Sequence, residues 1–315
     1  MPAMLPARIV ALLLALTGCL GPASAGDITA VPRTLAADAG PRPMLGETEV
    51  LGILELRSSD HRFGGLSGLS FDGNRLIAIT DKGNWLSFRL DVDHDGRPTG
   101  VGQLEIGALG GLDDGKLDSD SEELTKTPEG WLVSFERRHR VMLYAHGLTG
   151  KPVRLSMPQD YSRQPGNGGG EAVARLNDGR LLLLSEEGDN NDGTGWAWVG
   201  KSGAWERLST RREGLFHPTG AATLPNGDVL VTERRFTWIG GVALRLVRMN
   251  AASVRPGAVL SGHELFRLEP PLTVDNYEGI ALRQRADGRV VAYIISDDNF
   301  NPFQATLLMA VLLPD

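Results

Sequence analysis

Cysteine is nearly missing from this chain, since Cys19 is the only one among 315 residues. A disulfide framework is therefore excluded. Positive charge is also in deficit: 32 Lys and Arg face 39 Asp and Glu, giving a net charge of -7, which argues against a nucleic-acid binder. Beyond the N-terminal leader, no apolar run is long enough to span a bilayer. What remains is an acidic chain of ordinary globular composition, with 41% hydrophobic residues and 40 glycines.

The N-terminus has the features of an export signal. Residues 9–16, "IVALLLAL", form an apolar segment that is too short for a comfortable membrane span. Two processing sites compete: "LTGC" at 16–19 has the form of a lipobox that would lipidate Cys19, and "ASA" at 23–25 has the form of an ordinary cleavage site. Both predict an exported protein, periplasmic or anchored to the outer membrane, which meets the membrane only through a lipid on Cys19.

A unit of two apolar strands around a tight turn occurs five times along the chain. In each copy the turn ends in Gly or Asn, and the second strand ends on Ser, Thr or Phe followed by a carboxylate. The copies are anchored about 48 to 59 residues apart, which is typical of propeller blades. The anchor residues are Ser67, Glu122, Glu171, Thr219 and Glu278.

The intervening residues add two more short strands to each unit, so that each forms a four-stranded meander with strands A to D. The fifth unit has three strands, ending at 306–313, and the segment 48–56 can supply the fourth and close the ring. We therefore predict an all-β fold: a β-propeller of five four-stranded blades, with six blades as the alternative count. Residues 1–25 are the signal segment, 26–46 are a Pro-containing lead-in expected as a tether or disordered segment, and 47–315 are a single domain. The alternative is a sandwich of hairpins.

The propeller geometry predicts that acidic side chains gather at one mouth of the central channel. Strand A lines the channel and strand B runs antiparallel beside it, so the start of A and the end of B share one face. Like charges ~4 Å apart repel by about 4 kcal/mol at an effective dielectric near 20, and protonation, basic neighbours or a metal must offset this. Oxygen ligands suit Ca²⁺, with Mg²⁺ second; the alternative is that each acid only accepts backbone N–H bonds. The candidate metal ligands are Asp81, Glu122, Glu136, Glu171, Glu186, Glu233, Glu278 and Asp297.

Other residues near this mouth are candidates for binding and catalysis. Arg137 and Arg234 follow strand-B acids and can bind an anionic group, because guanidinium matches phosphate and carboxylate geometry. His217 precedes strand A of the fourth blade and is a candidate general base, or else a plain hydrogen-bonding residue. Two acidic loops, 91–96 and 186–195, are either cation ligands or ordinary solvated turns.

Several segments carry a family resemblance. "GGLSGLSFDGNRLIAITDKGNW", "LVSFERRHRVMLY", "PTGAATLPNGDVLVTERRF" and "NYEGIALRQRADGRVVAYIISDDNFNPFQATLL" resemble the phytase-like family of exported bacterial proteins, described as having esterase-like activity of phytase. The resemblance covers nearly all of 48–313 and implies a β-propeller and a metal-dependent phosphoester or ester hydrolase. One position departs from the pattern: a Glu-Gly-Leu step is usual in the second blade, and Glu123 stands where the Gly would be.

These observations predict a monomeric, exported propeller hydrolase that uses a metal ion and acts on a small anionic substrate. Glu171 and Glu278, together with Arg137, Arg234 and His217, form the expected catalytic set. Two alternatives stay open: a propeller lactonase with a central divalent cation, and a non-catalytic propeller that binds a ligand or partner of the cell envelope.

Overall fold

The computed structural model describes residues 24–112 and 119–315. The expected lipobox at 16–19, Cys19 and nearly all of the signal segment lie outside the described residues. Within the described part of the chain, no helix combines the length and the hydropathy needed to cross a bilayer. Most of these residues lie in strands and in the turns that join them.

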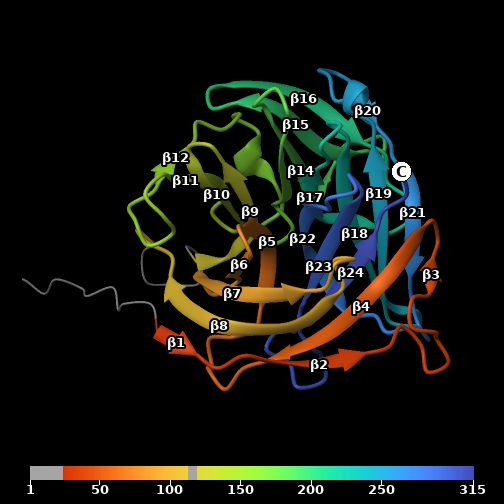
Figure 1. Cartoon of the computed structure of the whole chain (residues 1–315). Helices are drawn as coiled ribbons and strands as arrows, with labels where there is room; N and C mark the ends of the chain where they lie inside the picture. Colours follow the sequence, from red (N-terminus) through yellow and green to blue (C-terminus); the bar gives the residue numbers. More distant parts are fainter. Residues whose placement is uncertain (1–23, 113–118) are drawn as a thin grey trace, which may run out of the picture.

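Five antiparallel sheets are arranged around a common axis like the blades of a propeller (Figure 1). Blade 1 consists of β5 (Leu66–Asp72), β6 (Arg75–Thr80), β7 (Asn84–Val92) and β8 (Pro98–Ala108). Blade 2 consists of β9 (Ser121–Thr127), β10 (Gly130–Phe135), β11 (Arg140–Tyr144) and β12 (Val153–Arg154). Blade 3 consists of β13 (Gly170–Arg175), β14 (Leu181–Asp189), β15 (Gly195–Lys201) and β16 (Ala204–Thr210), with β20 (Val259–Leu260) paired to its edge.

The last two blades complete the ring. Blade 4 consists of β17 (His217–Thr223), β18 (Val229–Thr237), β19 (Gly241–Met249) and β21 (His263–Leu268). Blade 5 consists of β22 (Asn276–Gln284), β23 (Val290–Asp297), β24 (Leu307–Leu312) and β4 (Thr48–Arg57). The prediction of five four-stranded blades is confirmed, and the described residues contain no sixth.

The ring is closed by pairing the two ends of the chain. Strand β4, orange in Figure 1, lies antiparallel beside the C-terminal β24, with Leu54 opposite Leu308. The closing strand is therefore the one expected from the sequence. Because β4 and β24 come from opposite ends of the domain, their pairing ties the first blade to the last.

The segment 26–46 was expected to be a tether or a disordered segment, but two parts of it form paired strands. Strand β2 (Thr29–Arg33) pairs with the outer edge of β4, and β3 (Met44–Leu45) pairs with the start of the same strand. Strand β1 (Ser24–Gly26) pairs with the outer edge of β8. An outermost strand presents unpaired backbone N–H and C=O groups, and these N-terminal strands cover two such edges.

The hydrophobic core consists of layers between neighbouring blades. Each blade is covered on both faces, which explains why the second strand of each unit reads as a continuous apolar run. The leucines 181–184 of β14 illustrate this, since Leu182 and Leu184 pack toward blade 4, whereas Leu181 and Leu183 pack toward blade 2.

Strand A of every blade carries a one-residue β-bulge at the same place. In blade 3, Gly170 pairs with Ser185 and Ala172 pairs with Leu184, which leaves Glu171 as the extra residue. The same irregularity occurs in the other four blades. A bulge bends its strand and redirects a side chain. The bulges coincide with the five anchor residues of the repeat: Ser67, Glu122, Glu171, Thr219 and Glu278.

Below the bulges, the inner strands approach too closely to admit ordinary side chains. A Cβ built on Gly220 would lie 2.3 Å from the carbonyl oxygen of Glu278, and one on Gly68 would lie 2.3 Å from the backbone N of Leu124. The position after the bulge is accordingly small in four blades, namely Gly68, Ala172, Gly220 and Gly279.

Glu123 is the exception at this level and fills the channel. Its side chain is 1% exposed. One carboxylate oxygen accepts the backbone N–H of Leu124 at 2.8 Å, and the other accepts that of Ala221 in blade 4 at 3.0 Å. Burial raises its pKa well above the usual value, although these N–H bonds act in the opposite direction. The departure from the family pattern is therefore a cross-link between blades through the closed part of the channel.

Truncation at the closing strand is expected to destabilise the whole ring. Leu308→Ala removes a fully buried side chain of β24 and should lower the free energy of unfolding by about 2–5 kcal/mol. Val31→Ala in the outer strand β2, where the side chain is 37% exposed, should cost less than about 1 kcal/mol. Urea unfolding of both variants measures this, and equal losses would contradict the role of β24 in closure.

Removal of the buried Glu123 carboxylate should lower the free energy of unfolding more than removal of an exposed glutamate carboxylate elsewhere. Glu123→Ala leaves the N–H groups of Leu124 and Ala221 without acceptors, each worth about 1–3 kcal/mol when buried. Glu206→Ala, on an exposed position of β16, is the matched control. Comparable unfolding midpoints for the two variants would show that Glu123 does not connect the blades.

Candidate functional site

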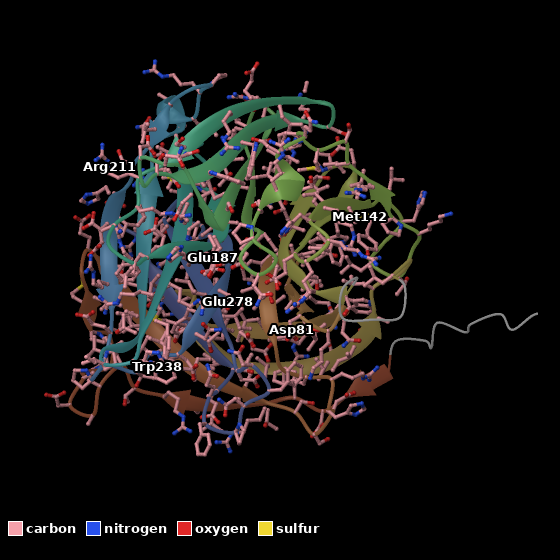
Figure 2. All side chains as sticks on the ribbon, turned by 180° about the vertical axis from the view of Figure 1, so that it is seen from behind. Asp81, Met142, Glu187, Arg211, Trp238 and Glu278 are labelled. Carbon is pink, nitrogen blue, oxygen red and sulfur yellow. The ribbon has the colours of Figure 1, made fainter. Side chains whose placement is uncertain are left out.

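Acidic side chains from four blades converge around the channel mouth. We call seven of them the acid ring: Asp81, Glu122, Glu136, Glu171, Glu186, Glu278 and Asp297. Figure 2 shows Asp81 and Glu278 near the middle of the disk, while Met142, Arg211 and Trp238 lie toward its periphery. The strand geometry explains this, because each member lies at a bulge in strand A or at the channel-mouth end of the paired part of strand B.

Blade 2 contributes the tightest group of carboxylates. Oxygen atoms of Asp120, Glu122 and Glu136 all lie within 4.8 Å of one another, close enough to share one cation. Asp120 was not among the residues expected from the sequence. The signal was present in "DSEE", since alternation along a strand puts residues 120 and 122 on the same side.

Five of the ring carboxyls hold their protons more tightly than ordinary acids. Burial, followed by the charges of Glu136 and Glu278, raises the pKa of Glu122 well above its usual value. Burial, followed by the charge of Glu186, does the same for Glu171. Burial and the Asp297 charge raise the pKa of Glu278 to about 8, despite the nearby Arg234. Part of the ring is therefore neutral at pH 7 when no cation is bound.

Burial also raises the pKa of the two best-anchored members. The pKa of Glu136 rises to about 7, chiefly through burial and with help from the Asp120 charge, although Glu136 accepts the backbone N–H of Gly168 at 2.8 Å. The pKa of Asp297 rises to about 7 for the same main reason, against its bond from the N–H of Asn299 at 2.6 Å. These backbone bonds fix the two side chains. They are the bonds expected under the alternative in which an acid at the end of a blade accepts backbone N–H groups.

Blade 4 differs from the others by placing a cation at the ring. His217 pairs with Arg234, and in blade 5 the equivalent pair is Asn276 with Asp297. Arg234 therefore occupies the ring position of its blade. Its Nη2 donates to Oε1 of Glu186 at 2.9 Å, and the charges of Glu278 and Glu186 raise its pKa although burial opposes this.

The expectation that Glu233 joins the ring is wrong. It precedes Arg234 in β18, and neighbouring residues in a strand point to opposite sides. Its Oε2 lies 3.1 Å from Nη1 of Arg245 in the adjacent strand. Burial raises its pKa to about 7, while the Arg245 charge lowers it.

The other predicted polar residues have defined partners. Nε of Arg137 donates to Asp120, and the backbone N–H of Arg137 donates to the carbonyl of Gly166. Nδ1 of His217 lies 2.7 Å from the carbonyl oxygen of Glu186. A carbonyl only accepts, so Nδ1 carries the proton and Nε2 of the neutral ring is free to accept one.

Backbone strain is concentrated beside the ring. Arg137 has φ of 55°, and both Asn299 and Phe300 have φ of 49°, in the left-handed region that side chains other than glycine rarely adopt. All three follow within three residues of the ring members Glu136 and Asp297. Strained non-glycine residues persist where their surroundings fix them, and functional sites are a common setting.

Apart from the ring member Glu186, the acids discussed in the two loops have partners away from the ring. In 91–96, Oδ1 of Asp93 accepts the backbone N–H groups of Asp95 and Arg97, and Asp95 pairs with Arg285. In 186–195, Asp189 pairs with Arg212 and Asp192 caps the N–H of Thr194. Both loops thus behave as ordinary turns.

Solved structures with a similar chain path include enzymes and a binding protein. One represents the GH130 family of mannoside phosphorylases, which contains glycoside hydrolases that target β-1,2 mannosidic linkages in Candida mannan; it has 11% identity over 95% of this chain and 96% of its own, with a TM-score of 0.46. A glycosyl hydrolase from Bacteroides ovatus has 11% identity over 80% and 84%, with a TM-score of 0.44. The calcium-binding protein regucalcin from Agrobacterium tumefaciens has 13% identity over 79% and 91%, with a TM-score of 0.39.

The sequence comparison is more decisive. No curated protein matches the chain significantly. The model of the phytase-like family, described as esterase-like activity of phytase, matches residues 61–300, a span that contains the whole acid ring and Arg234. The resemblance noted in the sequence is therefore confirmed, and the chain belongs to the phytase-like family.

Proposed function

We propose that this protein is an exported, metal-assisted hydrolase of phosphoesters or other esters, with the acid ring as its active site. The observation that carries the proposal is the convergence of seven carboxylates on one channel mouth with Arg234 among them. The leader at 1–25 supports export, to the periplasm or to the outer membrane through a lipid on Cys19. We expect a monomer that acts on a small anionic substrate.

The donor set fits a hard divalent cation. Asp120, Glu122 and Glu136 offer only oxygen atoms, within 4.8 Å of one another, which suits Ca²⁺ first and Mg²⁺ second. The like charges that raise the pKa of Glu122 are those that a cation would neutralise. When bound, the ion would polarise the ester and lower the pKa of a bound water molecule.

The remaining side chains supply orientation and proton transfer. Arg234 faces the ring and can bind the anionic group of the substrate, and Arg137 is held beside the blade 2 carboxylates for the same purpose. Nε2 of His217 can accept a proton from the attacking water. Glu278, with a pKa of about 8, holds a proton at pH 7 that it can give to the leaving oxygen. Glu171 is buried in the same ring, and its pKa is also raised well above the usual value.

The first test is the metal dependence of turnover. We expect purified protein to contain a divalent metal, to release product from a phosphoester or carboxylester panel, and to lose this activity with a chelator. Glu122→Gln should weaken metal affinity by at least about 10-fold, because it removes a charged ligand. Glu206→Gln, far from the ring on β16, is the control and should behave as wild type.

The outcomes separate the alternatives. Normal metal binding and normal turnover in Glu122→Gln would contradict the site. Lactone opening without ester or phosphate release would indicate the propeller lactonase. Metal binding with no turnover on any of the three substrate classes would indicate a non-catalytic propeller.

The second test separates proton transfer from binding. Glu278→Gln keeps the shape of the side chain and its place beside Asn276, but it removes the proton donor. We expect kcat to fall by about 10²-fold or more, with KM changed much less. A loss confined to KM would mean that Glu278 only helps to bind the substrate.

The pH dependence of stability provides a third test that needs no substrate. Three ring acids, Glu136, Glu278 and Asp297, have folded pKa values of about 7 to about 8, against usual values of 4.5 for Glu and 3.8 for Asp. In this window the unfolded chain binds fewer protons than the folded one, so the stability of metal-free protein should fall as pH rises from about 5 to about 8. Thermal unfolding with a chelator measures the slope. Glu278→Gln should flatten it, Glu206→Gln should not, and equal slopes in all three proteins would refute the shifted pKa values.

A further inference from the structure

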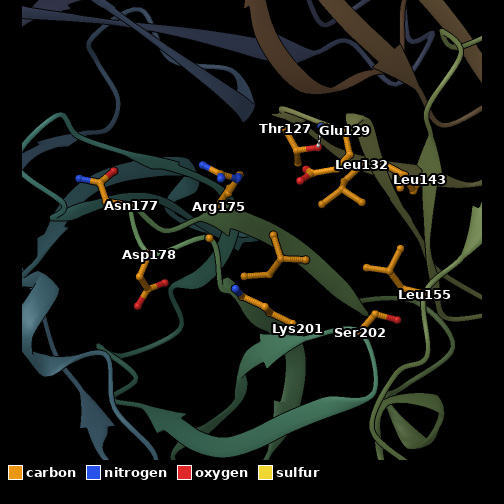
Figure 3. A pocket seen from close by; sticks show the side chains of 12 residues that line it. Thr127, Glu129, Leu132, Leu143, Leu155, Arg175, Asn177, Asp178, Lys201 and Ser202 are labelled. Atoms are coloured by element: carbon orange, nitrogen blue, oxygen red, sulfur yellow. Dashed lines mark hydrogen bonds between the residues drawn. The ribbon is translucent and has the colours of Figure 1, made fainter.

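The face opposite the acid ring has a separate cavity between blades 2 and 3. Its volume is about 440 Å³, within the range of sites for small molecules. Figure 3 shows Leu132, Leu143 and Leu155 on one side of it, and Arg175 and Lys201 on the other. It opens near the A–B turns, which lie at the far ends of the inner strands from the ring.

The cavity exists because blade 2 lacks a full outer strand. Strand β12 is two residues long, whereas the corresponding β16 of blade 3 has seven. The apolar layer between these blades is therefore incompletely covered at one end, and Leu143 and Leu155 remain partly exposed there. With Leu132 and Leu181 they form an apolar wall of four leucines.

Two cations, Arg175 and Lys201, converge at the rim of the cavity. A Cβ built on Gly179 would lie 3.6 Å from Nη2 of Arg175 and 3.7 Å from Nζ of Lys201, so both groups flank one point. Among residues 24–112 and 119–315, neither side chain forms a salt bridge or hydrogen bond. Arg175 also lines a second cavity of about 230 Å³.

The two acids of the lining, Glu129 and Asp178, neutralise this pair only in part. Asp178 is bound by Arg180, with Oδ2 at 2.7 Å from Nε and Oδ1 at 2.9 Å from the backbone N–H. Glu129 is exposed; its strongest interactions are with its own backbone N–H and the Thr127 hydroxyl, and weaker ones are with the charges of Arg175 and Lys201. When Asp178 is counted with Arg180, which lies outside the lining, Arg175 and Lys201 face Glu129 alone, and one positive charge is in excess next to the apolar wall.

We propose that this cavity binds an amphipathic monoanion, with a carboxylate between Arg175 and Lys201 and an alkyl or aryl group against the four leucines. An anion between the two cations would relieve their mutual repulsion and form charge-assisted hydrogen bonds. The site lies on the opposite face from the acid ring and does not depend on the hydrolase proposal. Glu123 fills the channel between them.

Calorimetric titration of the full chain with octanoate tests the proposal. We expect saturable binding by wild type, weakened at least about 10-fold in Arg175→Gln/Lys201→Gln and in Leu155→Gln. The variant Lys151→Gln, an exposed lysine of blade 2 that does not line the cavity, is the matched control and should bind as wild type. Octylammonium, which has the same chain and the opposite charge, should bind at least 10-fold more weakly than octanoate.

Three results would overturn the proposal: no saturable binding of octanoate, equal affinity for octylammonium, or unchanged octanoate affinity in the double variant. Circular dichroism of each variant establishes that it is folded before titration. Metal binding at the acid ring, measured with and without octanoate, should be unchanged, so failure at one site is distinguishable from failure at the other.

Discussion

The close approach of five inner strands around one channel is the constraint on which the rest of this structure depends. At Gly68 and Gly220 the neighbouring backbones leave no room for a Cβ. The strands satisfy this by carrying small residues at the narrow level and a bulge directly above it. The bulge places the anchor side chain toward the mouth, where the channel can hold it. The acidic site is thus a consequence of how the ring closes.

Crowding of like charges then determines the chemistry available at that mouth. Two isolated carboxylates could relax apart, but those of the acid ring are held by bulges, by backbone N–H donors such as those of Gly168 and Asn299, and by burial. The free energy of repulsion must be lowered by protons, by Arg234 or by a cation. The blade 2 group suits a cation, whereas Glu278 near Arg234 suits proton transfer. One ring can therefore offer two different functions.

The two faces of the disk are chemically distinct, and Glu123 lies between them. Above it, acids predominate; below it, the cavity between blades 2 and 3 presents two cations over an apolar wall. The difference follows from topology, because the ring face collects the starts of the inner strands and the other face collects the A–B turns.

The sequence by itself determined the blade architecture, because apolar periodicity and turn residues are local and recur five times. It also determined ring closure by 48–56, since an unpaired fifth unit needs a fourth strand, and it placed most acids at one mouth. Only the tertiary structure decided which side of a strand each residue occupies near the ends. A one-residue shift in register replaced Glu233 by Arg234 at the ring, and the contact of Asp120 with Glu122 and Glu136 emerged only from the folded chain. The pairing of 29–33 with β4, the cross-channel bonds of Glu123 and the convergence of Arg175 with Lys201 were likewise undetermined by sequence, because each depends on contacts between segments far apart in the chain.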